Sequence, residues 1–85
     1  MSEGNEILDR VGDIIASLFD VPRDEVSADT SMETLEAWDS LQHMNVVFDV
    51  EAAFDIEFEP EAVVRLSDVR SIVDAVQTAL SARTG

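Results

Sequence analysis

Apolar residues recur at spacings of three and four residues in three stretches of this 85-residue chain, and this periodicity constrains the fold more than any other feature. Such spacing places side chains on one face of an α-helix, whereas a strand requires strict alternation. The stripes are Ile7, Leu8, Val11, Ile14, Ile15 and Leu18; then Leu41, Met44, Val47, Phe48 and Phe54; and finally Val69, Ile72, Val73, Val76, Ala79 and Leu80. The pattern predicts three amphipathic helices packed through these faces.

Capping residues and prolines indicate where the helices begin and end. Ser2 or Asn5 is suited to cap the first helix. Val21-Pro22 ends it, because proline disfavours helical geometry in the residue before it. Pro60 suits the first position of a short helix over residues 60–66.

The last helix and the connections complete the expected fold. Ser67 or Asp68 caps that helix, and Arg83 and Gly85 suit its end. Residues 19–38 form a long polar connection with a brief helical turn over residues 31–35. Its isolated apolar residues can pin it to the core: Phe19, Val21, Val26, Met32 and Leu35.

Residues 55–59 alternate apolar and acidic side chains, which could indicate a strand, but the chain offers no second strand to pair with it. We therefore expect an extended loop there. The resulting fold class is all-α: a small four-helix bundle with three longer helices, one short helix and a long first loop. We expect one domain over residues 1–85, since the chain has no room for a second.

The charge balance narrows the choice of partners. Nineteen acidic residues against five arginines, with no lysine, give a formal charge of −14. This charge argues against nucleic acids and anionic membranes as partners, and favours basic protein surfaces. Hydrophobic residues make up 46% of the chain, which is too many for a disordered acidic segment.

Several function classes lack their sequence signatures. The chain has no cysteine, so disulfides and cysteine-based metal sites are excluded. No apolar run approaches membrane-spanning length, and the N-terminus lacks the basic start of a signal peptide. No segment has the calcium-loop spacing. We expect a cytoplasmic monomer without a metal site.

The sequence Trp38-Asp39-Ser40-Leu41 contains the candidate functional residue, Ser40. Asp39 is a good N-cap for a helix over residues 40–54, and Gln42 completes a variant capping box, which leaves the Ser40 hydroxyl facing outward. A serine in this position is by itself usually only part of a cap. Hydrolytic chemistry at Ser40 is not expected, because the one histidine, His43, lies only three residues on and no Gly-x-Ser-x-Gly motif is present.

The motif and its surroundings resemble the acyl carrier protein family. In that family an Asp-Ser-Leu triplet opens the second of four helices, and Asp39-Ser40-Leu41 matches it residue for residue. The resemblance implies that the phosphate of 4'-phosphopantetheine is esterified to Ser40. It also implies that Asp39 helps to position a divalent cation in the complex with the modifying synthase.

The resemblance extends over nearly the whole chain, without a gap from Asp39 to Val76. The matching apolar positions, which line the core or the acyl pocket in the family, are Leu41, Met44, Val47, Phe54, Val63, Leu66, Val69 and Val76. It implies a non-enzymatic carrier that presents acyl groups as thioesters in fatty-acid, polyketide or related biosynthesis. The implied partners are a phosphopantetheinyl transferase and enzymes that load or transfer acyl groups.

Trp38 departs from the family pattern, because many fatty-acid carriers have glycine or another small residue there. We expect its bulky side chain beside the arm. In having tryptophan at this position, the chain resembles discrete carriers of other pathways and peptidyl carriers. An aminoacyl or peptidyl carrier therefore remains an alternative. An acidic helical interaction module that is never modified is another.

The helix expected over residues 40–54 also departs from the family pattern. Gln42, Asn45 and Ala52 occupy positions that are often acidic in fatty-acid carriers, and Glu51 keeps one charge. We therefore expect Leu41 and Glu51 to keep a role in partner recognition. With fewer carboxylates on the helix, we expect recognition to depend more on His43, Met44, Val47 and the segment 55–61. His43 could also contact the arm. The expected partner surface is less basic than one that meets a typical fatty-acid carrier.

Overall fold

The computed structural model describes residues 3–84, which form four α-helices and one 3-10 helix. The helices are α1 (Glu3–Phe19), α2 (Ser40–Phe54), α3 (Pro60–Val63) and α4 (Val69–Thr84), with the 3-10 helix η1 (Arg23–Glu25) between α1 and α2. No strand occurs within residues 3–84, so the predicted helical bundle with three longer helices and one short one is confirmed. Ser2 and Gly85 lie outside the described residues, as do the side chains of Asn5 and Arg83.

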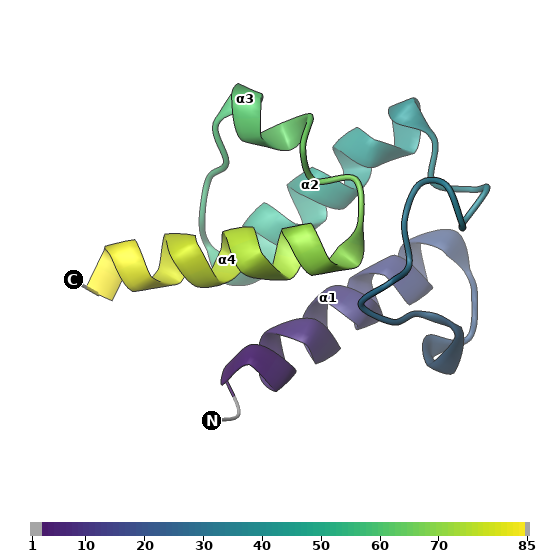
Figure 1. Ribbon diagram of the computed structural model, residues 1–85, viewed down its shortest axis with the longest axis horizontal. Coiled ribbons are helices and arrows are strands. Elements are labelled where there is room, and N and C mark those ends of the chain that lie inside the picture. Colours follow the sequence, from purple (N-terminus) through teal and green to yellow (C-terminus); the bar gives the residue numbers. More distant parts are fainter. Residues whose placement is uncertain (1–2, 85) are drawn as a thin grey trace.

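The long connection and the start of α2 lie together at one end of the molecule (Figure 1). The first turn of α1 and the last turns of α4 lie toward the opposite, left-hand side of that view, and α3 lies above α4. The serine that begins α2 is therefore placed at the end of the bundle where the loop packs.

The buried faces of α1 and α4 agree with their predicted stripes. Ile7, Val11 and Ile15 of α1 are buried, and so are Val69, Ile72 and Val76 of α4. The remaining predicted residues of α1 are partly buried against the same core. Burial of these aliphatic side chains stabilises the bundle by about 1.5–3 kcal/mol each.

The predicted stripe of α2 is only partly right: Val47 and Phe54 are buried as expected, but the packed face of the helix is turned away from the other three residues. The buried residues are His43, Val46, Val47, Val50 and Phe54, which also follow helical spacing. Leu41, Met44 and Phe48 point outward instead, with 77%, 41% and 57% of their surface exposed. Because α2 carries apolar residues on two faces, periodicity alone does not decide which face packs.

Left-handed aspartates end both α1 and α2. Asp20 and Asp55 each have a φ of 56°. The residue after each donates its N–H to the carbonyl five positions earlier: Val21 to Ala16 (3.0 Å) and Ile56 to Glu51 (3.1 Å). This arrangement is the Schellman motif. Helix α1 thus ends at Phe19, and the left-handed Asp20 comes just before the predicted Val21-Pro22 break.

The long connection is anchored by its predicted apolar residues and by backbone hydrogen bonds to the segment before α4. Val26 is buried, and the other four anchors are partly buried against the core. The Met32 N–H donates to the carbonyl of Ser67 (3.0 Å), and the Val69 N–H donates to that of Thr30 (2.9 Å). Residues 31–35 form a hydrogen-bonded turn rather than a helix, and the 3-10 helix η1 was not predicted.

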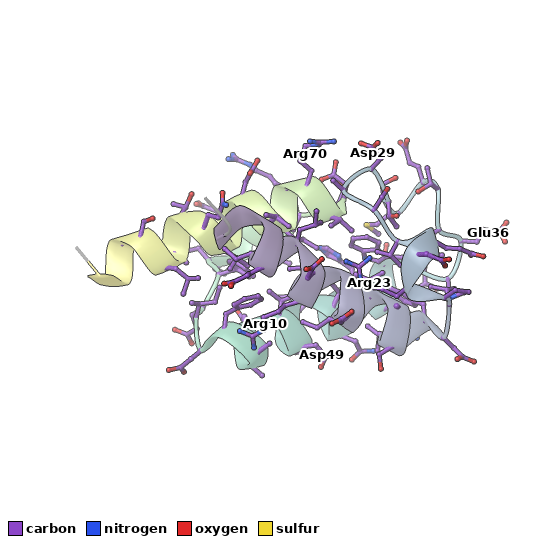
Figure 2. All side chains as sticks on the ribbon, turned by 90° about the horizontal axis from the view of Figure 1, so that it is seen from below. Arg10, Arg23, Asp29, Glu36, Asp49 and Arg70 are labelled. Carbon is purple, nitrogen blue, oxygen red and sulfur yellow. The ribbon has the colours of Figure 1, made fainter. Side chains whose placement is uncertain are left out.

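An ion pair adds a link between the same connection and α4. Arg70 Nη2 lies 2.7 Å from Asp29 Oδ1, and both side chains point outward in Figure 2. An exposed pair of this kind adds little to the free energy of unfolding. The backbone bonds and the buried anchors therefore hold the loop.

Candidate functional site

Ser40 is exposed and is the first residue of α2. Asp39 precedes it in an extended conformation, and the Asp39 Oδ1 atom accepts a hydrogen bond of 2.9 Å from the Gln42 N–H. The Asp39 carbonyl accepts the first helical bond, 2.8 Å from the His43 N–H. The predicted N-cap and the outward serine are confirmed.

The backbone around Ser40 leaves two N–H groups without a protein acceptor. Among the hydrogen bonds of residues 3–84, none is donated by the amides of Ser40 or Leu41. Free amides in the first turn and the positive end of the helix dipole favour an anion near the serine. A phosphodiester on the Ser40 hydroxyl fits this environment, although the Asp39 carboxylate is a like charge beside it.

Trp38 does not lie where the sequence predicted. Its side chain is 1% exposed, and its ring stacks on that of Phe19 with centroids 6.2 Å apart. The indole N–H donates a hydrogen bond of 3.0 Å to Nδ1 of His43. The indole is therefore an internal anchor of the loop and not a surface beside the arm.

His43 is also internal, which corrects its predicted role in partner contact. Only 8% of its surface is exposed, because α2 turns this residue toward α3. The ring Nε2 lies 2.8 Å from the Val63 carbonyl oxygen. Since Nδ1 accepts from Trp38, Nε2 carries the proton and donates to Val63.

Val47 needs a similar correction, whereas Glu51 has an internal contact that the sequence did not predict. Val47 belongs to the buried face of α2, so it cannot form part of a docking surface. Glu51 is half-buried, and its Oε2 atom accepts a hydrogen bond of 2.8 Å from the Phe58 N–H. This carboxylate therefore holds the loop after α2, in addition to any role at the surface.

The residues that α2 does present beside Ser40 are mainly apolar. Leu41, Met44 and Phe48 lie three and four positions apart on its outer face, and Asp49 is exposed next to them. Sequence reasoning included Leu41 and Met44 among the recognition residues but missed Phe48, and it missed the exposed Val64 after α3. Only the packing of the helices, the orientation of α2 for Phe48 and the placement of α3 for Val64, reveals these two.

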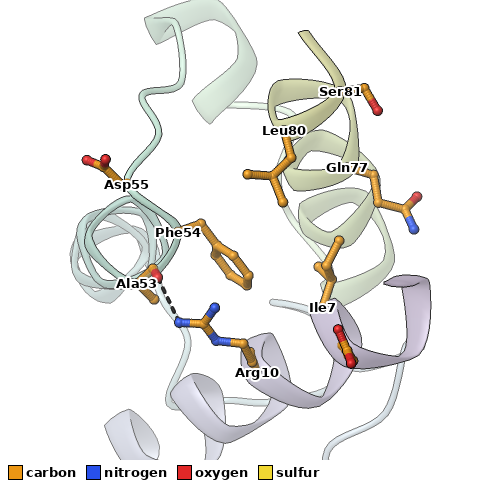
Figure 3. A pocket seen from close by; sticks show the side chains of 9 residues that line it. Ile7, Arg10, Ala53, Phe54, Asp55, Gln77, Leu80 and Ser81 are labelled. Carbon is orange, nitrogen blue, oxygen red and sulfur yellow. Dashed lines mark hydrogen bonds between the residues drawn. The ribbon is translucent and has the colours of Figure 1, made fainter. Parts of the chain in front are cut away.

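A cavity of about 640 Å³ lies at the far end of α2, between that end and helices α1 and α4. Figure 3 shows Phe54, Leu80 and Ile7 lining it, with Arg10 at its side. Arg10 donates to the Ala53 carbonyl (2.7 Å) and lies 4.4 Å from the Phe54 ring centroid. Ala53 lies thirteen positions after Ser40 along α2, a distance of about 20 Å at the helical rise of about 1.5 Å per residue. The cavity therefore does not adjoin the serine.

The described residues contain neither a metal-binding cluster nor a helix that could span a membrane. Within residues 3–84, no group of three or more histidine, aspartate or glutamate side chains is arranged to hold a metal ion. In the same part of the chain, no helix has the length and hydrophobicity to cross a membrane.

Comparison with known proteins matches most of the chain to one family. Residues 9–76 match the family model described as a phosphopantetheine attachment site. An acyl carrier protein of Lactococcus lactis subsp. cremoris (strain MG1363) is 34% identical over 71 residues, which cover 84% of this chain and 89% of the relative. Acyl carrier protein 3 of Ralstonia nicotianae is 29% identical over 77 residues, covering 91% and 88%.

A solved structure with the same fold also comes from an acyl carrier protein. The solution structure of a holo acyl carrier protein from Geobacter metallireducens superposes with a TM-score of 0.81 at 28% identity, covering 99% of this chain and 92% of the other. The fold and the matched attachment region thus define a helical carrier domain for a covalent 4'-phosphopantetheine group. The chain belongs to the acyl carrier protein family. Members of this family carry substrates and are not themselves enzymes, as the sequence predicted.

Proposed function

We propose that Ser40 is the residue to which 4'-phosphopantetheine is attached, and that this carrier presents acyl groups to partner enzymes. The observation that supports Ser40 is its exposed hydroxyl at the first position of α2, beside two free backbone amides. Ser40 stands in the Asp-Ser-Leu triplet, within the region that matches the family model.

The protein's own residues would bind and orient the group. The Ser40 oxygen holds the phosphate, and the amides of Ser40 and Leu41 stabilise its charge. Asp39 holds the turn through its cap and offers a second carboxylate oxygen to a divalent cation during modification. When bound, the group supplies a thiol at the end of a flexible arm, where an acyl group is carried as a thioester. The chain has no cysteine, so this thiol is not supplied by the protein.

The attachment can be tested with the apo-protein, coenzyme A, magnesium and a broad-specificity phosphopantetheinyl transferase, with intact mass as the readout. We expect a gain of one phosphopantetheinyl group in the wild type and none in Ser40→Ala. The exposed Ser17 of α1 gives a matched control, because Ser17→Ala removes a helical hydroxyl elsewhere. A wild type that stays unmodified would refute the assignment and favour an unmodified interaction module. A Ser40→Ala variant that gains the group would refute it differently, by moving the attachment to another residue.

A second variant separates the two roles of Asp39. Asparagine caps a helix as well as aspartate does, so Asp39→Asn should leave the thermal stability nearly unchanged. The same change removes the carboxylate proposed to help position the cation. We expect slower modification of Asp39→Asn, with part of the rate recovered at higher magnesium concentration.

We also propose that partner enzymes dock on the outer face of α2. Leu41, Met44 and Phe48 are exposed there in one stripe that starts beside Ser40. Asp49 adds one charge to this face. A partner that matches it has an apolar contact region with a small basic component, in keeping with the less basic surface predicted from the sequence.

The finer assignments stay predictions. The pathway could be fatty-acid, polyketide or related biosynthesis, and an aminoacyl cargo remains an alternative. The single carrier domain, the monomeric state, the cytoplasmic location and the lack of nucleic-acid or membrane partners are likewise predicted from the sequence.

A further inference from the structure

Two buried aromatic side chains flank the turn that carries Ser40 in the sequence and contact each other. Trp38 and His43 lie on either side of it in the sequence, stack with centroids 5.9 Å apart and share a hydrogen bond of 3.0 Å. Asp39, Ser40 and Leu41 between them are all exposed. The exposed turn is thus held at both ends by internal contacts.

The same imidazole connects this turn to α3. Its Nε2 atom lies 2.8 Å from the carbonyl oxygen of Val63, twenty residues away and the last residue of α3. Within residues 3–84, this is the one hydrogen bond that joins α3 to a side chain of another helix. A helix of four residues has no fully buried side chain here and is too short to persist without tertiary contacts.

This bond also relates two exposed apolar regions. Val64 follows Val63 and is 77% exposed, while Met44 follows His43 and is 41% exposed. The hydrogen bond joins His43, directly before Met44, to Val63, directly before Val64. It therefore sets the distance between the apolar face of α2, next to Ser40, and the end of α3.

We propose that His43 is a positioning residue, which holds α3 against the Ser40 turn so that enzymes acting on the serine meet α2 and Val64 as one preformed surface. This proposal rests on the proposed attachment at Ser40. Without the bond to Val63, α3 would occupy this position only part of the time. The apparent affinity of an enzyme then falls by the fraction of molecules in the competent position.

Two substitutions of His43 separate its two hydrogen bonds. Glutamine places an amide nitrogen close to the position of Nε2 and can still donate to Val63. Asparagine reaches only the position of Nδ1, so it can accept from Trp38 but cannot reach Val63. The indole N–H signal of Trp38, the one tryptophan in the chain, reports on the Trp38 bond in an NMR spectrum.

Steady-state kinetics of a phosphopantetheinyl transferase, with each apo-protein as the varied substrate, test the proposal. We expect His43→Asn to raise KM about fivefold to tenfold with kcat unchanged, because one hydrogen bond of ordinary strength is lost. His43→Gln should keep KM within about twofold of the wild type. An unchanged KM in His43→Asn, an equal rise in both variants, or a fall in kcat alone would overturn the proposal.

An exposed variant keeps the test informative if a change at His43 impairs folding. Val64→Ser alters a residue that is not buried, so the fold should persist. We expect it to raise KM, and to add little in the His43→Asn background, where α3 is already displaced. A KM indifferent to Val64→Ser would overturn the proposal. Failure to modify the wild type at Ser40 would instead refute the proposed attachment, so the two failures are distinguishable.

Discussion

The guanidinium group of Arg23 lies beside Gly12 of α1, in the space that a Cβ atom at position 12 would enter. Arg23 reaches this place from η1, as its position against α1 in Figure 2 illustrates. It donates to the Val26 carbonyl (2.8 Å) and forms ion pairs with Asp13 (3.1 Å) and Asp9 (3.4 Å). The glycine thus lets the first loop be tied to α1.

Gly12→Ala should affect the free energy of unfolding differently in two backgrounds. Alanine favours an interior helical position over glycine by about 1 kcal/mol. In the wild type we expect this gain to be offset, since Arg23 must leave its partners. In Arg23→Ala we expect Gly12→Ala to raise the free energy of unfolding by about 0.5–1 kcal/mol. Urea denaturation of the four proteins measures the coupling.

The coupling should be close to 1 kcal/mol, because exposed ion pairs contribute little and the bond to Val26 contributes more. If Gly12→Ala has the same effect in both backgrounds, something other than the arginine restricts position 12.

Asp20→Gly should stabilise the protein. Asp20 has a φ of 56°, a region that glycine enters without strain. Its carboxylate also lies at the negative end of the α1 dipole. Asp20→Ala removes the same charge but keeps a side chain in the left-handed region. We therefore expect the midpoint of urea denaturation to correspond to about 1 kcal/mol more stability in Asp20→Gly than in Asp20→Ala. Equal stabilities would mean that backbone strain at Asp20 is negligible.

Asp68 should make a pH-dependent contribution to stability. Its Oδ1 accepts 2.7 Å from the Ser71 N–H, which confirms Asp68, one of two predicted candidates, as a cap of α4. The Ser71 hydroxyl first, and then this backbone N–H, hold the pKa of the Asp68 carboxyl below its ordinary value. A lowered folded-state pKa gives stability that is present above the ordinary aspartate pKa, about 4, and is lost as pH falls through the folded-state value.

Comparison with Asp68→Asn isolates that contribution, because asparagine keeps the cap without the titration. At neutral pH the wild type should be the more stable of the two, by a few tenths of a kcal/mol up to about 1 kcal/mol. The difference in thermal stability should shrink as pH falls below the ordinary aspartate pKa, about 4, and disappear once the folded-state carboxyl is protonated. A difference that persists in acid would show that it arises from packing and not from the carboxylate.

Local chemistry explains which features could be predicted from the sequence. The N-caps at Asp39 and Asp68, the proline at the start of α3 and the stripes of α1 and α4 each depend on a few neighbouring residues. The extended loop at residues 55–59 followed from the lack of a pairing partner, and the structure agrees. Interactions of this range are encoded within one or two helical turns.

The features that could not be predicted depend on tertiary packing. His43 is polar and was placed on the surface, yet it is buried because Trp38 and the Val63 carbonyl satisfy both ring nitrogens. The pairing of residue 31 with residue 68 joins segments far apart in the chain. Each of these contacts requires two partners whose positions are fixed only after the helices pack, so neither leaves a periodic signal in the sequence.

Affinity for acyl-handling partners should depend more on the apolar face of α2 than on its charges. Phe48 is 57% exposed, and burying the rest of its ring against a partner gives a factor of about 10 in affinity. We therefore expect Phe48→Ser to weaken binding of the holo-protein about tenfold, while the neighbouring change Asp49→Asn alters it less than about twofold. Raising salt from low to moderate concentration should have a correspondingly small effect in calorimetric titrations. A steep loss of affinity with salt, traced to Glu51 or other carboxylates of α2, would contradict an apolar docking surface.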